Sequence, residues 1–153
     1  MFTSGSWKKS SSGEESDVIN PATGEVIASV PKANLDDVNA CIQSSRQAFQ
    51  SKEWASMDPA QRGRILQKMA NATYANAKML AEIESTNNGK TFREALSEIR
   101  YGAWTLEYFA GLSDKIEGKT IPVPGNRLNY TLRQPLGVTA HIIPWNFPLQ
   151  LAL

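Results

Sequence analysis

The chain has 153 residues, enough for one domain with a sizeable core. Its 16 basic and 15 acidic residues give a formal net charge of +1 without a block of like charge, which argues against a nucleic-acid partner and a polybasic membrane anchor. The single cysteine, Cys41, excludes an internal disulfide, and no apolar run approaches the roughly 18 residues of a membrane span. We therefore expect a cytoplasmic protein without a nucleic-acid or membrane partner.

The first 31 residues fall into two parts. Residues 1–17 are rich in serine, glycine and charge and lack the apolar core of a secretory signal, so we expect a flexible tail there. Residues 18–31 form two short runs around Pro21-Ala22-Thr23-Gly24, which predicts a β-hairpin. Gly24 supplies the positive φ that such a turn requires.

A first helix is predicted for residues 35–50, with Asn34 as its N-cap. Its apolar residues recur at the helical period of 3.6 and define one face that should be buried. Cys41 lies on this face, so we interpret it as a small core residue and not as a nucleophile.

Two further helices have clear boundaries. One begins after Asp58, is expected to break near Asn76, and ends at Asn88-Gly89. The other opens with the capping box Thr91-Phe92-Arg93-Glu94 and continues with apolar residues at helical spacing to Ala110. Its wide apolar arc indicates that it packs against more than one neighbour.

Strand patterns follow the helices. Residues 128–133 alternate between apolar and polar side chains, which is typical of a strand with one face towards solvent or a partner. After Pro135 and Gly137, residues 138–143 are almost continuously apolar, as in a parallel strand covered on both faces. His141 lies within this run, and we interpret it as a packed core residue and not as a proton-transfer group.

The loop after this strand has a restricted backbone. Pro144 and Pro148 fix their own φ angles and favour extended conformations at the residues before them. The Asn146 carboxamide between them should therefore point in a reproducible direction. In open α/β sheets, ligands bind at the carboxyl ends of strands, where this loop would lie. The sequence thus predicts an oriented hydrogen-bond donor near a ligand site.

Five motifs in order resemble the NAD(P)-dependent aldehyde dehydrogenase family. They are Asn20-Pro21-Ala22-Thr23-Gly24-Glu25, Asn88-Gly89-Lys90, Ile116-Glu117-Gly118-Lys119-Thr120-Ile121-Pro122, Arg133-Gln134-Pro135-Leu136-Gly137-Val138 and Pro144-Trp145-Asn146-Phe147-Pro148. Each motif alone is weak, but five in register from about residue 18 to the end make a chance match improbable. The chain resembles the amino-terminal third of such an enzyme.

The resemblance implies an incomplete α/β fold, in which an amino-terminal β-hairpin and helices precede the first strand of a Rossmann-like nucleotide-binding domain. The implied divisions are a flexible tail (1–17), a β-hairpin (18–31), the helical part of the nucleotide-binding domain (32–118), an oligomerisation-type strand region (119–136), and the first nucleotide-binding strand with the active-site loop (137–153). At full length, the resemblance implies a homo-oligomer.

The resemblance also assigns roles to the loop. Asn146 aligns with the oxyanion-hole asparagine, a catalytic residue, and Ile143, Pro144, Trp145 and Asn146 align with the segment that lines the nicotinamide end of the NAD or NADP site. The implied activity oxidises a small-molecule aldehyde to a carboxylic acid with NAD(P)+ through a cysteine thiohemiacetal, which water activated by a glutamate later resolves. No metal site is predicted.

No residue of this sequence matches the family's cysteine nucleophile or its general base. Cys41 is far from Asn146 in sequence and fits no nucleophile motif. We therefore expect the 153-residue chain alone to be inactive. The alternative is a non-catalytic interaction protein that pairs with full-length subunits through the strand at residues 128–133.

Overall fold

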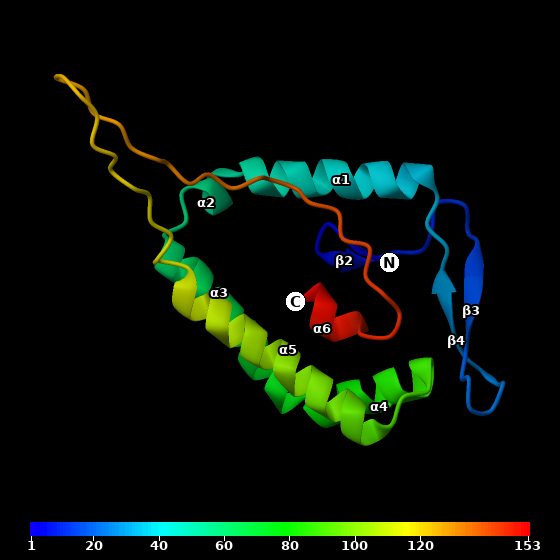
Figure 1. The fold of residues 1–153 in the computed structure, drawn as a ribbon. Helices are drawn as coiled ribbons and strands as arrows, with labels where there is room; N and C mark the ends of the chain where they lie inside the picture. Colours follow the sequence, from blue (N-terminus) through cyan, green and yellow to red (C-terminus); the bar gives the residue numbers. More distant parts are fainter.

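A computed structural model describes all 153 residues, with short hairpins at the amino terminus and a body of helices. The strands are β1 (Phe2–Thr3), β2 (Ser6–Trp7), β3 (Glu15–Ile19) and β4 (Val26–Pro31). The helices are α1 (Leu35–Gln50), α2 (Lys52–Ala55), α3 (Pro59–Ala75), α4 (Ala77–Asn88), α5 (Phe92–Leu112) and α6 (Pro148–Ala152). In Figure 1, α1 runs along one side, α3, α4 and α5 form the opposite side, and α6 lies between them.

The amino-terminal segment is structured, which corrects the prediction of a flexible tail over residues 1–17. β1 pairs with β2, and β3 pairs with β4 from Glu15 onward, both antiparallel. The side chain of Asp37, in the first turn of α1, accepts hydrogen bonds from Ser10 Oγ at 2.7 Å and from the Ser11 amide at 3.0 Å. These contacts between residues distant in sequence hold the segment, and its polar composition could not reveal them.

The helices of the body, α3, α4 and α5, begin and end where the sequence predicts. Asp58 caps α3 by accepting from the Ala60 amide at 2.8 Å, and Asn76 separates α3 from α4. α4 ends at Gly89, whose φ of 82° is left-handed. The side chains of Thr91 and Glu94 form the capping box that opens α5.

Small residues allow the helices of the body to approach closely. The buried cluster between α4 and α5 consists of Ala77, Ala81, Ala95 and Ile99. At Gly63 of α3, an added Cβ would lie 2.7 Å from the backbone carbonyl oxygen of Ala110 in α5. A close seam between α3 and α5 therefore requires glycine at this position.

α1 has no buried residue, so the predicted burial of Cys41 is wrong in this chain. The side chains of Val38 and Ile42, on the same apolar face, are 45% and 44% exposed. The helical period correctly marks the apolar face, but only the short β1–β2 hairpin borders it here, and its side chains stay partly exposed. Periodicity predicts which face is apolar, not whether a partner is present.

Residues 119–136, here called the arm, project from the body as an extended ribbon (Figure 1). The arm contains one isolated antiparallel bridge, between Thr120 and Tyr130. Flanking it, the Ile121 amide donates to the Asn129 carbonyl at 2.8 Å and the Thr131 amide donates to the Lys119 carbonyl at 2.9 Å. The predicted strand at 128–133 is thus reduced to a bridge, because no further strand extends the ladder.

The predicted strand at residues 138–143 is also absent, since no neighbouring strand supplies the hydrogen bonds that define a ladder. Ile142 is fully exposed. His141 is exposed too, and its Nε2 lies 2.9 Å from Thr139 Oγ1, so its predicted place in a packed core is wrong in this chain. Both errors have one cause, which is that the pattern describes a strand inside a sheet that these residues do not form alone.

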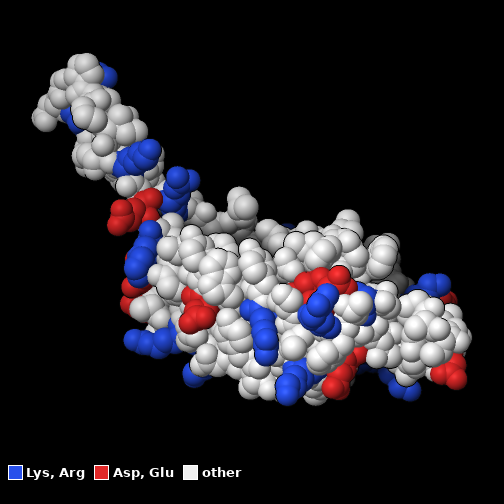
Figure 2. Space-filling model, turned by 60° about the horizontal axis from the view of Figure 1, so that its bottom comes forward, with Lys and Arg blue, Asp and Glu red and all other residues white.

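Basic and acidic side chains are interspersed over the helical body on the face that Figure 2 shows, whereas the charged residues of the arm are all basic: Lys119, Arg127 and Arg133. None of the helices combines the length and the apolar character needed to span a bilayer. The helical body therefore offers no extended single-sign region on this face that would concentrate a polyanion.

Candidate active-site loop

The predicted loop forms a compact turn that leads into α6. The Phe147 amide approaches the Pro144 carbonyl oxygen at 3.4 Å, and the Phe147 carbonyl accepts from the Leu151 amide at 3.1 Å. Pro148 occupies the first position of α6, where its missing N–H costs no helical hydrogen bond and its fixed φ suits the helix. The two prolines and α6 together restrict the backbone around Asn146.

The four predicted site residues are consecutive and mostly accessible. Ile143 is half-buried, whereas Pro144, Trp145 and Asn146 are exposed, Trp145 to 77%. An exposed Asn146 leaves its carboxamide accessible to a bound molecule. The arrangement offers one amide donor beside an exposed apolar surface.

A hollow of about 450 Å³ lies where the loop meets α4 and α5. Its lining combines apolar side chains with a few polar ones: Leu80, Ile83, Glu84, Asn87, Asn88, Ile99, Trp145, Pro148 and Leu149. Cys41 is not part of this lining; it borders a different hollow beside the amino-terminal hairpin. The structure therefore does not bring the single cysteine to the predicted donor.

A buried ion cluster contacts the same loop. Lys90 Nζ donates to Glu84 Oε1 at 2.9 Å and also donates to Glu98 Oε2. It further donates to the backbone carbonyl of Asn146 at 2.5 Å. The ammonium lies 4.7 Å from the centre of the Phe147 ring, a distance that permits a cation–π interaction. One lysine thus joins α4, α5 and the loop.

The backbone around Lys90 is fixed from both sides. Gly89 adopts its left-handed conformation at the end of α4, and the Gly89 amide donates to the Ser85 carbonyl at 3.0 Å. The Ser85 hydroxyl donates to the Lys90 carbonyl at 2.7 Å, and the Lys90 amide donates to Asn88 Oδ1 at 3.0 Å. Thr91 then caps α5. The Asn88-Gly89-Lys90 motif is therefore a turn that sets the starting point of the lysine side chain.

Burial governs the electrostatics of the cluster. The side chains of Lys90, Glu84 and Glu98 are only 14%, 6% and 16% exposed. Desolvation raises the pKa of Glu84, against the lowering effect of its hydrogen bond from Lys90. Burial also opposes the charge of Lys90, but hydrogen bonds to Glu98 and Glu84 outweigh it and raise the pKa of the lysine. The lysine is held in its cationic form.

The sequence pattern assigns no role to this cluster. Lys90 is 6 residues from Glu84, 8 from Glu98 and 56 from Asn146, and these separations match no single helical face. The only available signal is the Asn88-Gly89-Lys90 motif, which indicates a helix end and not a partner for the loop. The contact depends on tertiary packing.

Known proteins resemble this chain in both sequence and fold. A sequence profile of the aldehyde dehydrogenase family matches residues 7–153. Aldehyde dehydrogenase 1A1 of Homo sapiens is 42% identical over 97% of this chain and 30% of its own length, and aldehyde dehydrogenase, cytosolic 1 of Mus musculus is 44% identical with the same coverage. A solved NAD+ complex of aldehyde dehydrogenase from Bacillus cereus matches with a TM-score of 0.96 at 38% identity, over 99% of this chain and 31% of that one.

The chain therefore spans about 30% of the length of the curated relatives. The structural match confirms the expected α/β fold class, an incomplete amino-terminal portion of the aldehyde dehydrogenase fold. The family resemblance carried by the five motifs is also confirmed. This chain belongs to the aldehyde dehydrogenase family.

Proposed function

We propose that this chain supplies the oxyanion-binding donor and part of the nicotinamide site of an NAD(P)-dependent aldehyde dehydrogenase. The observation that carries the proposal is an exposed Asn146 on a turn restricted by Pro144 and Pro148. Membership of the family supports aldehyde oxidation as the activity of the whole protein.

The proposed chemical role of Asn146 is electrostatic. When a thiolate attacks an aldehyde, the carbonyl oxygen becomes negatively charged, and the Asn146 carboxamide N–H donates a hydrogen bond to it. A donor fixed in advance stabilises charge that appears only as the bond forms, so it lowers the barrier without tightening the binding of the aldehyde. Removal of such a donor typically lowers the rate by about 10²- to 10³-fold.

The residues beside Asn146 fit a nicotinamide cofactor. Ile143, Pro144 and Trp145 present apolar surface, and Trp145 is largely exposed, which suits contact with a flat ring. The Bacillus cereus neighbour was solved as an NAD+ complex, which supports NAD or NADP as the cofactor. A bound nicotinamide would supply the acceptor for the hydride that leaves the substrate carbon. This chain's residues would hold one side of the ring and orient the carbonyl oxygen.

The test uses a chimera, in which this segment is part of a complete enzyme whose activity can be measured. We would replace the matching segment of human aldehyde dehydrogenase 1A1 with residues 7–153 and measure NADH production from an aldehyde. We expect Asn146→Ala to lower kcat by about 10²- to 10³-fold. Asn71→Ala, at an exposed asparagine of α3 whose side chain contacts Gln67 on the same helix, is the matched control and should leave kcat within about two-fold. An unchanged kcat in Asn146→Ala would refute the proposed role.

The 153-residue chain alone is proposed to be inactive. Its only cysteine lies on α1, outside the hollow beside the loop, and no second nucleophile motif is present. NADH production that depends on an added aldehyde, from the purified chain, would contradict this. For the whole protein we propose a cytoplasmic location, supported by the mouse relative named cytosolic, and a homo-oligomeric state.

A second candidate is a non-catalytic protein that pairs with full-length subunits. The arm favours it, because Leu128 and Leu132 are 76% and 71% exposed and the ribbon edge is unpaired. Mixing the chain with a full-length relative, followed by size-exclusion chromatography, should give a stable mixed complex if this reading is right. Replacing both leucines by serine should abolish that complex, and separate elution of the unmodified chain would exclude the interaction function.

A further inference from the structure

We propose that Lys90 is a positioning residue for Asn146, which it orients through the backbone carbonyl of Asn146 and not through its side chain. The inference rests on the proposed function, because it concerns the donor of that reaction. Lys90 Nζ donates to this carbonyl at 2.5 Å. The carbonyl and the carboxamide belong to the same residue, so a fixed carbonyl limits rotation of the peptide and sets the direction of the Cα–Cβ bond from which the carboxamide projects.

All three hydrogen-bond donors of the Lys90 ammonium group have an acceptor. It has three N–H donors and no acceptor, and the structure provides one acceptor for each: a carboxylate on α4, a carboxylate on α5 and the loop carbonyl. Because the three acceptors lie on three separate segments, the lysine can satisfy all of them only when the loop sits at a defined distance from both helices. The hydrogen bonds of Lys90 therefore set the position of the loop relative to the helical body.

Two carboxylates give the lysine its anchor. Glu84 and Glu98 are both nearly buried and hold the ammonium from the side of the helices. Hydrogen bonds from a charged donor are shorter and stronger than neutral ones. The third bond is therefore directed at the loop from a fixed point, and the Phe147 ring at 4.7 Å covers the ammonium from the loop side.

Pro144 and Pro148 alone do not fix the position of the loop relative to the helices. They restrict dihedral angles within the turn but leave its placement against the helices free. Catalytic geometry is sensitive to placement, since a displacement of about 1 Å can cost roughly 10²-fold in rate. Lys90 supplies the missing constraint, and α6 supplies a second one by packing against α5 near Gly102, whose added Cβ would lie 3.2 Å from Leu153 Cδ1.

The sequence allows this contact to be observed directly in the 153-residue chain. Asn146-Phe147 is the only Asn-Phe pair, so labelling asparagine with ¹³C at its carbonyl and phenylalanine with ¹⁵N gives a single correlated NMR signal, which reports the Asn146 carbonyl carbon. With ¹⁵N-labelled lysine added, we expect a scalar coupling across the hydrogen bond between Lys90 Nζ and this carbon. Absence of that coupling in the folded, unmodified chain would overturn the proposal.

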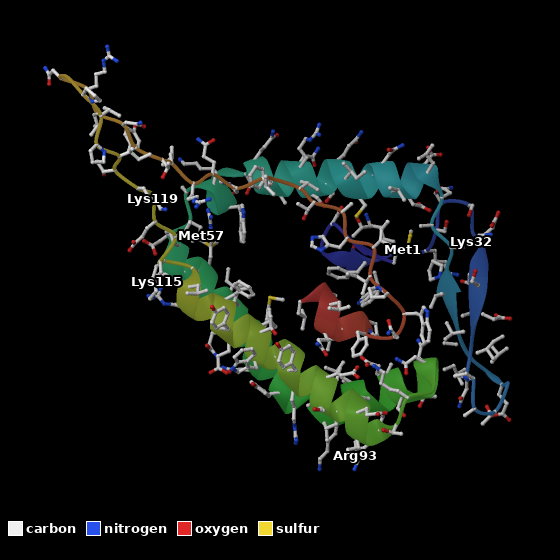
Figure 3. The ribbon with its side chains drawn as sticks, in the orientation of Figure 1. Met1, Lys32, Met57, Arg93, Lys115 and Lys119 are labelled. Atoms are coloured by element: carbon white, nitrogen blue, oxygen red, sulfur yellow. The ribbon has the colours of Figure 1, made fainter.

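Variants separate positioning from charge balance. Lys90→Met removes the donors but leaves two buried carboxylates without their cation, so it should lower the melting temperature as well as shift the carbonyl signal. The triple variant Lys90→Met, Glu84→Gln, Glu98→Gln removes that charge problem. Lys115→Met is the matched control, since it removes an exposed ion pair with Asp114 at the far end of α5 from Arg93 and the loop (Figure 3).

We expect the triple variant to recover the melting temperature while the Asn146 carbonyl signal stays shifted to lower frequency, as for a carbonyl that has lost a cationic donor. Lys115→Met should leave the signal unchanged. If the signal returns to its original position in the triple variant, Lys90 serves only to balance charge and the proposal is wrong. Because this readout needs neither substrate nor cofactor, it is independent of the chimera assay, whose failure would count against the proposed function alone.

Discussion

Two helical glycines, Gly63 on the α3–α5 seam and Gly111 on an open surface of α5, provide a direct test of the packing that supports the loop. An added Cβ at Gly63 would lie 2.7 Å from the Ala110 carbonyl oxygen, a backbone atom that cannot move without shifting α5. At Gly111, also in α5, an added Cβ would meet nothing within 4 Å. Both substitutions to alanine gain helix propensity, so the difference between them isolates the steric cost.

The magnitudes follow from these distances. Glycine to alanine in a helix stabilises by about 0.5 to 1 kcal/mol, which is the full expectation for Gly111→Ala. Overpacking a close contact costs about 1 to 3 kcal/mol, so after the gain in helix propensity Gly63→Ala should be net destabilising by up to about 2.5 kcal/mol. For a chain of this size, about 1 kcal/mol corresponds to roughly 2 to 4 °C.

Thermal unfolding followed by far-ultraviolet circular dichroism measures both variants against the unmodified chain. Gly111→Ala should melt above it and Gly63→Ala below it. The reasoning is refuted if Gly63→Ala melts at or above Gly111→Ala, because the two helices would then not approach as closely as the structure shows. Far-ultraviolet spectra before heating would confirm that both variants start from the same helix content.

Three further changes test the anchors of the fold. Thr91→Ala should destabilise the chain by about 0.5 to 2 kcal/mol in urea unfolding, since it removes the cap of α5. Gly102→Val should raise amide hydrogen exchange in residues 149–152 and leave α3 protected, because the new side chain displaces α6 from α5. The Ser10 hydrogen bond lowers the pKa of Asp37 to about 2, so the carboxylate's contribution to stability is present above its ordinary value of 3.8 and is lost as the pH falls through about 2. The chemical shift of the Ser11 amide should change with pH as the Asp37 carboxyl titrates. This pH-dependent change should be absent in Asp37→Asn.

Local signals in the sequence predict the elements that depend on local contacts. The caps at Asp58 and Thr91, the break at Asn76 and the left-handed Gly89 all appear where their residue types indicate. Each of these features involves groups within a few positions of one another, so a short stretch of sequence contains both interacting partners. The same reasoning gives the turn at Gly24, whose φ is 74°.

Predictions that depend on distant partners fail or stay incomplete. The alternation at residues 128–133 and the apolar run at 138–143 describe side-chain faces correctly, but a strand exists only when another strand accepts its hydrogen bonds. Cys41 and His141 are exposed for the same reason. A pattern predicts burial only if another strand or helix covers that face, and no such element covers it in this chain.

The cluster of Lys90, Glu84 and Glu98 has a role that no local signal in the sequence indicates. Nothing near Glu98 in the sequence connects it to Asn146, yet it holds the ammonium of Lys90, whose remaining hydrogen bond goes to the Asn146 carbonyl. A change at Glu98, 48 positions away and on a different element, should therefore behave as a change in the loop. Glu98→Ala leaves Lys90 with one carboxylate, so the ammonium can shift towards Glu84 and away from the carbonyl. The direction of the proposed oxyanion donor is thus a property of the helical body as much as of the two prolines beside it.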